Sequence, residues 1–303
     1  MALPRTILAG RTYFITRRCL FRLFLLVPSK FLNHLFKFCL GYAANKFGIK
    51  VHLAVVLSNH YHLIVSDPNG LLPKFCHLLN SLLARVLNAY LGRSETFWAP
   101  GSYSAVALET PVDFYEKAGY LLANPVAAGL VERAFDWPGF ITPPSWLLGK
   151  SSSRLHVRRP KFFFGERTDL PQDAKLEFTI PEMLGEVSPQ EAVSRIEQQR
   201  ARLENAAHRK LASEGRSFLG TKAVLAQKPD ERSKSEEPRF QLSPTIACRC
   251  RWKRIEALQS LASWRREYER CRQRFLAGDR EVLFPPGTWG PRVIYGALVR
   301  PAS

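Results

Sequence analysis

The sequence lacks the features that mark secreted, membrane-spanning or zinc-stabilised proteins. Its six cysteines form no C-x-x-C pair and have no regular spacing, which argues against a disulfide framework or a structural zinc site and favours free thiols. The most apolar stretch, residues 19–42, is interrupted by charges and proline before the ~20 clean residues that span a bilayer. The first ten residues also lack the pattern of a signal peptide. We therefore expect a cytoplasmic protein without membrane contact.

Acidic residues are scarce relative to basic ones. The chain has 44 Lys and Arg against 26 Asp and Glu, a formal net charge of +18. A protein this basic usually binds a polyanion, most often nucleic acid. Both halves carry the excess, with 15 basic against 7 acidic residues up to Lys150 and 29 against 19 after it. The charge indicates a nucleic-acid partner but says nothing about catalysis.

Chain length and changes in composition predict three parts. The 303 residues exceed the usual size of one domain. We expect a first domain over residues 1–148, a linker over 149–187 and a basic, mainly helical region over 188–303.

Within the last part, three patterns predict local structure. A capping box with proline at the first helical position predicts a long exposed helix over residues 189–213. An arginine-rich helix is expected over 254–277, and a short strand over 293–299. The stretch 228–238 is charged and has no apolar residue, which predicts disorder.

The first 148 residues show an alternation of strand and helix patterns. The order is strand, helix, strand, strand, helix, strand, helix, with helices expected over 30–47, 72–91 and 110–124. This order predicts an α+β fold of the ferredoxin-like, split βαβ type, an antiparallel four-stranded sheet with helices on one face. The other face would then be free for a ligand.

Two histidines lie two residues apart in the apolar run 51–65. Because side chains alternate along a strand, His60 and His62 point to one face and Tyr61 to the other. The pair is either half of a metal site or two ordinary histidines at a strand end. The surrounding residues do not decide between these alternatives.

A tyrosine and an asparagine share a face of the third predicted helix. Tyr120 and Asn124 are four residues apart, and Pro125 is expected to end the helix just after them. The alternatives are a packing tyrosine and a capping asparagine. Tyr115 competes with Tyr120, but position 119, four residues later, is glycine and offers no carboxamide.

Three segments together resemble a known family. They are residues 10–18 (GRTYFITRR), 57–65 (LSNHYHLIV) and 120–131 (YLLANPVAAGLV). In this order and spacing they look like the REP-associated tyrosine transposases, single-tyrosine members of the bacterial HUH endonucleases. The resemblance covers residues 10–140, under half of the chain. It implies an HUH endonuclease core, with Mg²⁺ or Mn²⁺ held by His60, His62 and Asn124, and Tyr120 as the nucleophile.

The function that this resemblance implies is cleavage and rejoining of single-stranded DNA through a 5′-phosphotyrosine intermediate. The substrate would be a hairpin or palindromic DNA element, at the nucleoid of a bacterial cell. Arg17 and Arg18 would contact DNA phosphates, unless they are a solvated strand end. The choice between a monomer and a homodimer stays open. The alternative function is a non-catalytic nucleic-acid-binding protein that retains the transposase fold.

Two positions depart from the family's pattern. Ala127 stands where an arginine is common, and Ser58 where proline is frequent. Neither change removes a chemical group from the implied site, but the first removes a phosphate contact.

Other residues allow two interpretations. His52 either faces the site or is a buried, hydrogen-bonded histidine. Phe97, Trp98 and Tyr103 either stack on unpaired bases or pack in the core. Residues 249–280 include ten basic and four acidic side chains, which predicts an auxiliary DNA-binding arm or, alternatively, a solvated helical face.

Overall fold

The protein has a mixed α+β fold. The computed structural model describes residues 4–101, 103–149, 153–162, 164, 169–233 and 244–301. Its strands are β1 (Arg11–Arg18), β2 (Lys50–Leu57), β3 (His60–Asp67), β4 (Ser104–Leu108), β5 (Arg154–Arg158), β6 (Asp173–Glu177) and β7 (Ile246–Ala247). Its α-helices are α1 (Lys30–Phe47), α2 (Leu72–Tyr90), α3 (Pro111–Ala127), α4 (Pro189–Ser213), α5 (Thr221–Leu225), α6 (Arg251–Leu276) and α7 (Gly290–Tyr295). Short 3-10 turns lie at Leu20–Arg22, Ala134–Asp136, Pro144–Leu148 and Glu182–Leu184.

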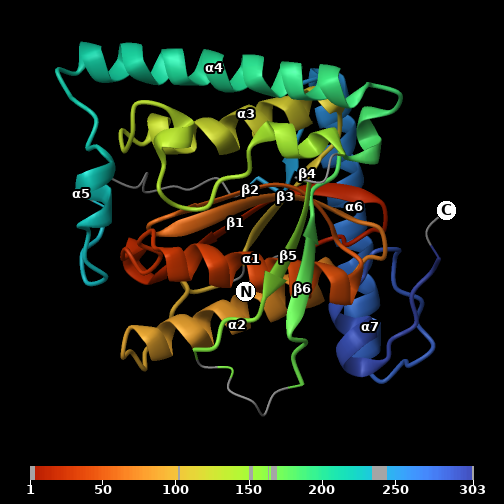
Figure 1. The fold of residues 1–303 in the computed structure, drawn as a ribbon. Helices are drawn as coiled ribbons and strands as arrows, with labels where there is room; N and C mark the ends of the chain where they lie inside the picture. The colour runs from red at the N-terminus through yellow and green to blue at the C-terminus, as the bar shows by residue number, and fades with distance from the viewer. Residues whose placement is uncertain are drawn as a thin grey trace.

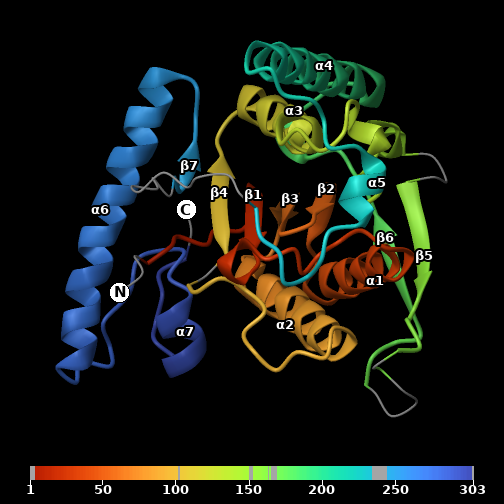
Figure 2. The ribbon, with the colours of Figure 1, turned by 90° about the vertical axis from the view of Figure 1, so that its left-hand side faces the viewer.

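The central sheet has the strand order β2-β3-β1-β4-β7. The first four strands pair antiparallel, and β7 joins β4 in parallel. Figure 2 shows this order, with α6 outside β7. The fifth strand was not predicted, because a segment of two residues carries no periodic pattern.

Helices cover both faces of the sheet. Figure 1 shows α1 and α2 on one face, α3 on the other and α4 outside α3. The prediction of one face left free for a ligand is therefore wrong. Every residue of β2 and β3 after the first is buried, so both faces of the sheet need an apolar cover.

The segment predicted as a linker contains a β-hairpin. Strands β5 and β6 pair antiparallel and pack on α1. The inward side chains Val157, Ala174 and Leu176 are buried. Gly41 of α1 allows this close approach, since a Cβ there would lie 3.1 Å from the Cβ of Leu176. The basic and serine-rich composition of this segment did not indicate the short amphipathic hairpin.

Helix α4 has the predicted bounds but is exposed on one side only. Its capping residue Ser188 accepts a hydrogen bond from the backbone N–H of Glu191. The opposite side packs on α3, where Gly119 leaves no room for a side chain, because an added Cβ would lie 2.7 Å from the Cβ of Gln199. Helix α4 therefore supports the back of α3.

The C-terminal predictions have mixed outcomes. Helix α6 starts three residues before its predicted start. Helix α7 occupies the first three residues of the predicted strand 293–299, from which only Val299 pairs, with Phe284. Of the stretch predicted to be disordered, residues 228–233 run beside the core, where Arg232 pairs with Leu23. Residues 234–238 lie outside the described residues. No helix in the described ranges is long and apolar enough to cross a membrane.

Candidate active site

The two histidines lie at the start of β3 and face α3. A two-residue turn, Ser58-Asn59, precedes the strand, and His60 is its first residue. Tyr61 points to the opposite face, where its buried hydroxyl donates to Asn80 Oδ1 at 2.7 Å. The predicted alternation of these three side chains is confirmed.

Helix α3 carries the tyrosine and the asparagine over this end of β3. The helix begins at the cap Thr110, whose hydroxyl accepts from the Asp113 N–H. The prediction that Pro125 ends the helix is wrong: the helix continues to Ala127, and Gly129, with φ of +71°, turns the chain away. Pro125 has no N–H to donate to the carbonyl four residues before it, so the helix loses one hydrogen bond near its end.

Four predicted residues come together at this point. The Nε2 atoms of His60 and His62 are 3.1 Å apart, and Asn124 Nδ2 lies 3.3 Å from His62 Nε2. The ring centroid of Tyr120 is 5.7 Å from that of His62. Asn124 and His62 are buried, whereas the side chain of Tyr120 is 44% exposed. The phenol is therefore open to a large substrate.

Neighbouring side chains orient both imidazoles. Asn59 Nδ2 donates to the carbonyl of Arg22, and its Oδ1 accepts from His60 Nδ1 at 2.6 Å. His62 Nδ1 lies 2.8 Å from Thr16 Oγ1, which can accept its proton while His62 Nε2 accepts from Asn124. With the tautomers assigned in this way, each ring carries its proton on Nδ1, and both Nε2 atoms can ligate a cation.

This arrangement fits a divalent cation. Two adjacent ligands at about 2.1 Å from a metal lie about 3.0 Å apart, close to the observed Nε2 separation of 3.1 Å. The side-chain amide of Asn124 can present its oxygen by rotation. In the described part of the chain no three His, Cys, Asp or Glu residues are grouped for metal binding. The ligands offered are thus two imidazoles and an amide, without a carboxylate.

Burial sets the protonation of the site. Burial, together with the smaller effect of the Arg18 and Arg22 charges, lowers the pKa of His60 to about 4. Burial also lowers the pKa of His62, as do His60 and Lys117. Both rings are therefore neutral at pH 7, the form that binds metals. Burial raises the pKa of Tyr120, against a hydrogen bond from Asn124, so the phenol keeps its proton at pH 7.

The two arginines that were predicted to bind DNA lie on opposite faces of the sheet. Arg18 pairs in register with His60, and its charge acts on that ring. Arg17 points away, donates to the Gly101 carbonyl at 3.1 Å and covers the Trp98 ring at 5.6 Å. Only Arg18 lies beside the site, because neighbouring residues of a strand alternate.

Sequence reasoning missed Lys117 and Phe14. The Lys117 ammonium lies 5.6 Å from the ring centroid of Tyr120 and 5.4 Å from that of Phe14. Phe14 also contacts the rings of His62 and Tyr120. The spacing of three residues between Lys117 and Tyr120 was a signal available in the sequence. The position of Phe14 depends on strand pairing and gave no local signal.

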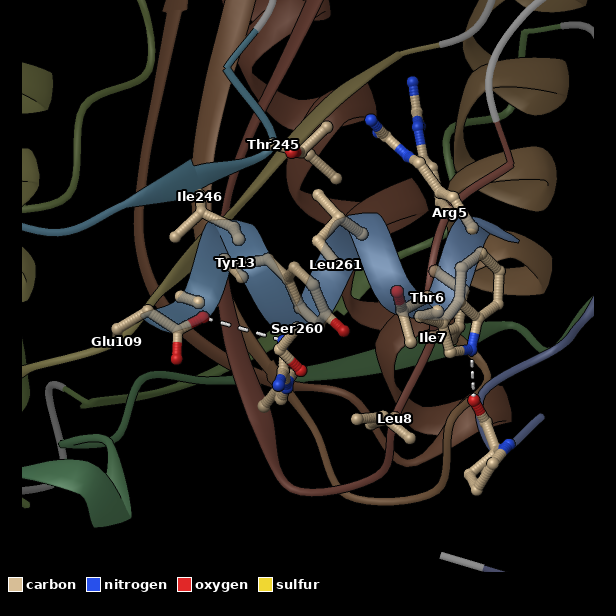
Figure 3. A pocket seen from close by; sticks show the side chains of 17 residues that line it. Arg5, Thr6, Ile7, Leu8, Tyr13, Glu109, Thr245, Ile246, Ser260 and Leu261 are labelled. Carbon is tan, nitrogen blue, oxygen red and sulfur yellow. Dashed lines mark hydrogen bonds and ion pairs between the residues drawn. The ribbon is translucent and has the colours of Figure 1, made fainter. Parts of the chain in front are cut away.

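The competing residues have structural roles. Tyr115 is 6% exposed and lies under Arg195 of α4. His52 is buried, with its ring nitrogens bonded to the Thr179 carbonyl and Ser66 Oγ. Phe97 and Trp98 are buried in the core, as in the packing interpretation. A separate cavity of about 190 Å³ between β4 and α6, lined by Arg5, Tyr13, Glu109, Ser260 and Leu261 among others, contains none of the candidate residues (Figure 3).

Comparison with known proteins assigns no family. No family model and no curated protein matches the chain. A solved REP-associated tyrosine transposase bound to a REP hairpin is similar at 19% identity and a TM-score of 0.41, over 57% of this chain and 96% of that one.

Two further solved structures show weaker likenesses. A putative transposase from Deinococcus radiodurans has 18% identity and a TM-score of 0.28, over 35% of this chain and 85% of that one. The tRNA(His) guanylyltransferase of Saccharomyces cerevisiae has 9% identity and a TM-score of 0.30, over 72% and 83%. Identities and scores this low leave the function to be inferred from the site itself.

Proposed function

We propose that the chain is a metal-dependent endonuclease and strand transferase for single-stranded DNA, of the REP-associated tyrosine transposase type. The observation that carries the proposal is the meeting of His60, His62 and Asn124 beside the half-exposed phenol of Tyr120. The strand order β2-β3-β1-β4, with α1 and α2 on one face, supports the ferredoxin-like core of that type. Hairpin DNA is the proposed substrate, because a stem offers shape and its unpaired flank offers readable bases.

In the proposed reaction, the Tyr120 oxygen attacks the scissile phosphorus in line. A bond forms between this oxygen and phosphorus, and the bond from phosphorus to the 3′ oxygen breaks. The phenolic proton passes to solvent, and the 3′ oxygen takes up a proton to leave as a 3′-OH. Arg18 and Lys117 place positive charge on either side of the histidine pair, where the phosphate would lie. The reverse attack by a 3′-OH would rejoin the strand without ATP.

His60, His62 and Asn124 would hold the divalent cation, Mg²⁺ or Mn²⁺. When bound, it would supply Lewis-acid polarisation of the phosphate and stabilise the leaving oxygen. The chain contributes neutral imidazoles whose Nε2 atoms are directed by Asn59 and Thr16. Because one chain brings the histidines and Tyr120 together, we propose that a single copy suffices for cleavage.

A covalent adduct tests this proposal. The parent protein, incubated in Mn²⁺ with hairpin oligonucleotides taken from imperfect palindromes beside the gene, should form a protein–DNA adduct that survives denaturing electrophoresis. Tyr120→Phe should form none, and EDTA should abolish the parent's adduct. Tyr115→Phe, in the same helix, is the matched control and should react as the parent does. An adduct on Tyr120→Phe at the parent's level would refute the assignment.

A non-catalytic DNA-binding protein is the second candidate. The observation that favours it is Ala127, which occupies the position of a common phosphate-binding arginine at the end of α3. In that case hairpin binding would survive EDTA, and no hairpin in a library would be cleaved. Both candidates act on chromosomal DNA, which is consistent with a place at the bacterial nucleoid.

We also propose that α6 is an auxiliary DNA-binding arm. Its exposed side chains include Arg251, Arg254, Arg266 and Arg270. The double variant Arg266→Gln/Arg270→Gln should reduce the slope of log affinity against log salt by about 1 to 2. Arg202→Gln/Arg209→Gln on α4 is the matched control. Equal slopes for the two double variants would favour a merely solvated helix.

A further inference from the structure

A strained segment lies at the edge of the candidate site. Phe21 and the next residue, Arg22, have φ of +48° and +61°, and no other non-glycine residue in the described ranges has a positive φ. The left-handed conformation is unfavourable for both side chains. Two consecutive residues of this kind persist only where the surroundings impose the conformation, often at functional sites.

The surroundings fix this segment by hydrogen bonds from both flanks. The backbone N–H of Cys19 donates to the Asn59 carbonyl at 2.8 Å, and that of Leu20 donates to the Phe97 carbonyl at 2.9 Å. The Arg22 N–H closes the turn on the Cys19 carbonyl at 3.2 Å. The turn is therefore rigidly attached to the loop that precedes His60.

One side chain connects this turn to a candidate metal ligand. The amide of Asn59 donates to the Arg22 carbonyl at 3.4 Å and accepts from His60 Nδ1 at 2.6 Å. The positive charge of Arg22 also acts on the His60 ring. The strained turn and the site are thus parts of one hydrogen-bonded unit, in which a phosphate would be attracted to the side of His60.

The strain places a large aromatic ring in solvent. The side chain of Phe21 is 70% exposed, and it stacks on no other ring within the described residues. At this exposure the ring contributes little to packing. Its location next to Arg18, Arg22 and the site distinguishes it from other exposed apolar residues, such as Tyr295 on α7, which is also 70% exposed.

We propose that Phe21 is a stacking platform for an unpaired base of the DNA strand whose phosphate lies at Tyr120. The inference rests on the proposed function and adds a substrate contact to it. A planar base matches a flat exposed ring, and the adjacent cations match the backbone phosphate. The rigid turn would set the position of the base relative to the histidine pair, so Phe21 acts as a positioning residue for the strand.

Binding without cleavage tests the contact. The probe is a fluorescein-labelled 20-residue oligothymidylate, and fluorescence anisotropy in EDTA measures its affinity for the full chain. Phe21→Ala should weaken binding about 5-fold or more, the smallest loss expected for one stacked base. Phe21→Trp should bind as the parent does. Tyr295→Ala is the matched control of equal exposure and should change affinity less than 2-fold.

A glycine variant separates contact from structure. Phe21→Gly relieves the left-handed strain, so the variant should unfold at a temperature no lower than the parent does. Its affinity for the probe should still be about 5-fold weaker than the parent's. A structural role for the ring would instead lower both stability and affinity. Photocrosslinking with 5-iododeoxyuridine in the same probe should map to the peptide that contains Phe21.

The outcomes separate this contact from the proposed chemistry. A parent that binds the probe through Phe21 but forms no adduct with any hairpin would refute the cleavage reaction and leave the contact standing. Phe21→Ala binding within 2-fold of a parent that does form the adduct would refute the contact alone. No binding of the probe by the parent would refute the contact, and the adduct assay on hairpins would still decide the cleavage reaction.

Discussion

On one face of β3 the hydroxyl of Tyr61 is fully buried and donates to Asn80, and its ring packs on Phe36 and Trp98. On the other face, the Nε2 atoms of His60 and His62 lie 3.1 Å apart beside a half-exposed tyrosine. The two faces belong to three consecutive residues. On the first face the Tyr61 hydroxyl has its partner within the protein, whereas on the second the two Nε2 atoms contact each other and the Asn124 amide, in a position where both could bind a cation.

This difference agrees with the proposed chemistry on the face of the histidines. Buried polar groups are normally paired, so a closed hydrogen bond such as that of Tyr61 is a feature of stability. Two neutral imidazoles held 3.1 Å apart, with both δ-nitrogens bonded elsewhere, can share a proton or bind a cation through their Nε2 atoms. The comparison predicts that substitutions on the two faces have opposite effects on activity and on folding stability.

Substitution of His62 should have the largest effect on activity. His62→Ala removes one of the two imidazoles and should reduce adduct formation in Mn²⁺ by more than about 100-fold, since even partners of metal ligands are worth 10- to 100-fold. The thermal unfolding temperature without metal, measured on the same variant, separates loss of the proposed ligand from loss of the hydrogen bonds that His62 makes with Thr16 and Asn124. Adduct formation by His62→Ala at the parent's level would show that the two faces of β3 do not differ in their importance for activity.

The sequence predicted the parts of the site that depend on local periodicity. Alternation along a strand placed His60 and His62 together, and the four-residue spacing on a helix placed Tyr120 with Asn124. The same alternation also separates Arg17 from Arg18, so only one of the two lies on the face of the histidines. Only the register of β1 against β3 shows which arginine is beside the site.

The remaining features depend on contacts between distant segments. Thr16 reaches His62 across 46 residues of sequence, and Gly119 fits against α4 some 80 residues further on. Neither contact has a local pattern. The sequence could have predicted that a helix covers the second face of the sheet, as α3 does. Strands β2 and β3 are apolar at nearly every position, so neither of their faces could lie in water.

A third histidine tests whether a place on the α3 side is enough for a metal-binding role. His52 contacts Phe114 of α3, but both of its nitrogens have partners, and burial lowers its pKa from 6.5 to about 4. Between these pH values, His52 is therefore protonated in the unfolded chain but not in the folded chain. Stability is lost as the pH falls from about 6.5 to 4, by up to about 3 kcal/mol from this group.

Comparison with a variant isolates that contribution. The difference in unfolding free energy between the parent and His52→Gln should shrink as the pH falls from 7.5 to 4, as measured by urea unfolding at each pH. Adduct formation by His52→Gln should stay near that of the parent under conditions where both are folded. A difference that is independent of pH would show that His52 is not held neutral.

Removal of the Tyr61 hydroxyl should affect stability alone. Tyr61→Phe leaves the buried Oδ1 of Asn80 without its donor, which should cost about 1 to 3 kcal/mol in the unfolding free energy. The rate of adduct formation should remain within about 2-fold of the parent's. Asn80→Leu in the Tyr61→Phe background should recover part of the loss, because it removes the orphaned acceptor. A large loss of activity in Tyr61→Phe would show that the two faces are coupled.

The smallest expected effect comes from the adjacent arginines. Arg18→Gln removes a positive charge beside His60 and should weaken oligothymidylate binding a few-fold, with a salt slope lower by about 1. Arg17→Gln should leave both affinity and slope unchanged, because its guanidinium lies over Trp98 on the opposite face. It should instead lower stability slightly through loss of that contact. Equal salt slopes in the two variants would mean that DNA extends around the end of β1 and contacts both faces of the sheet.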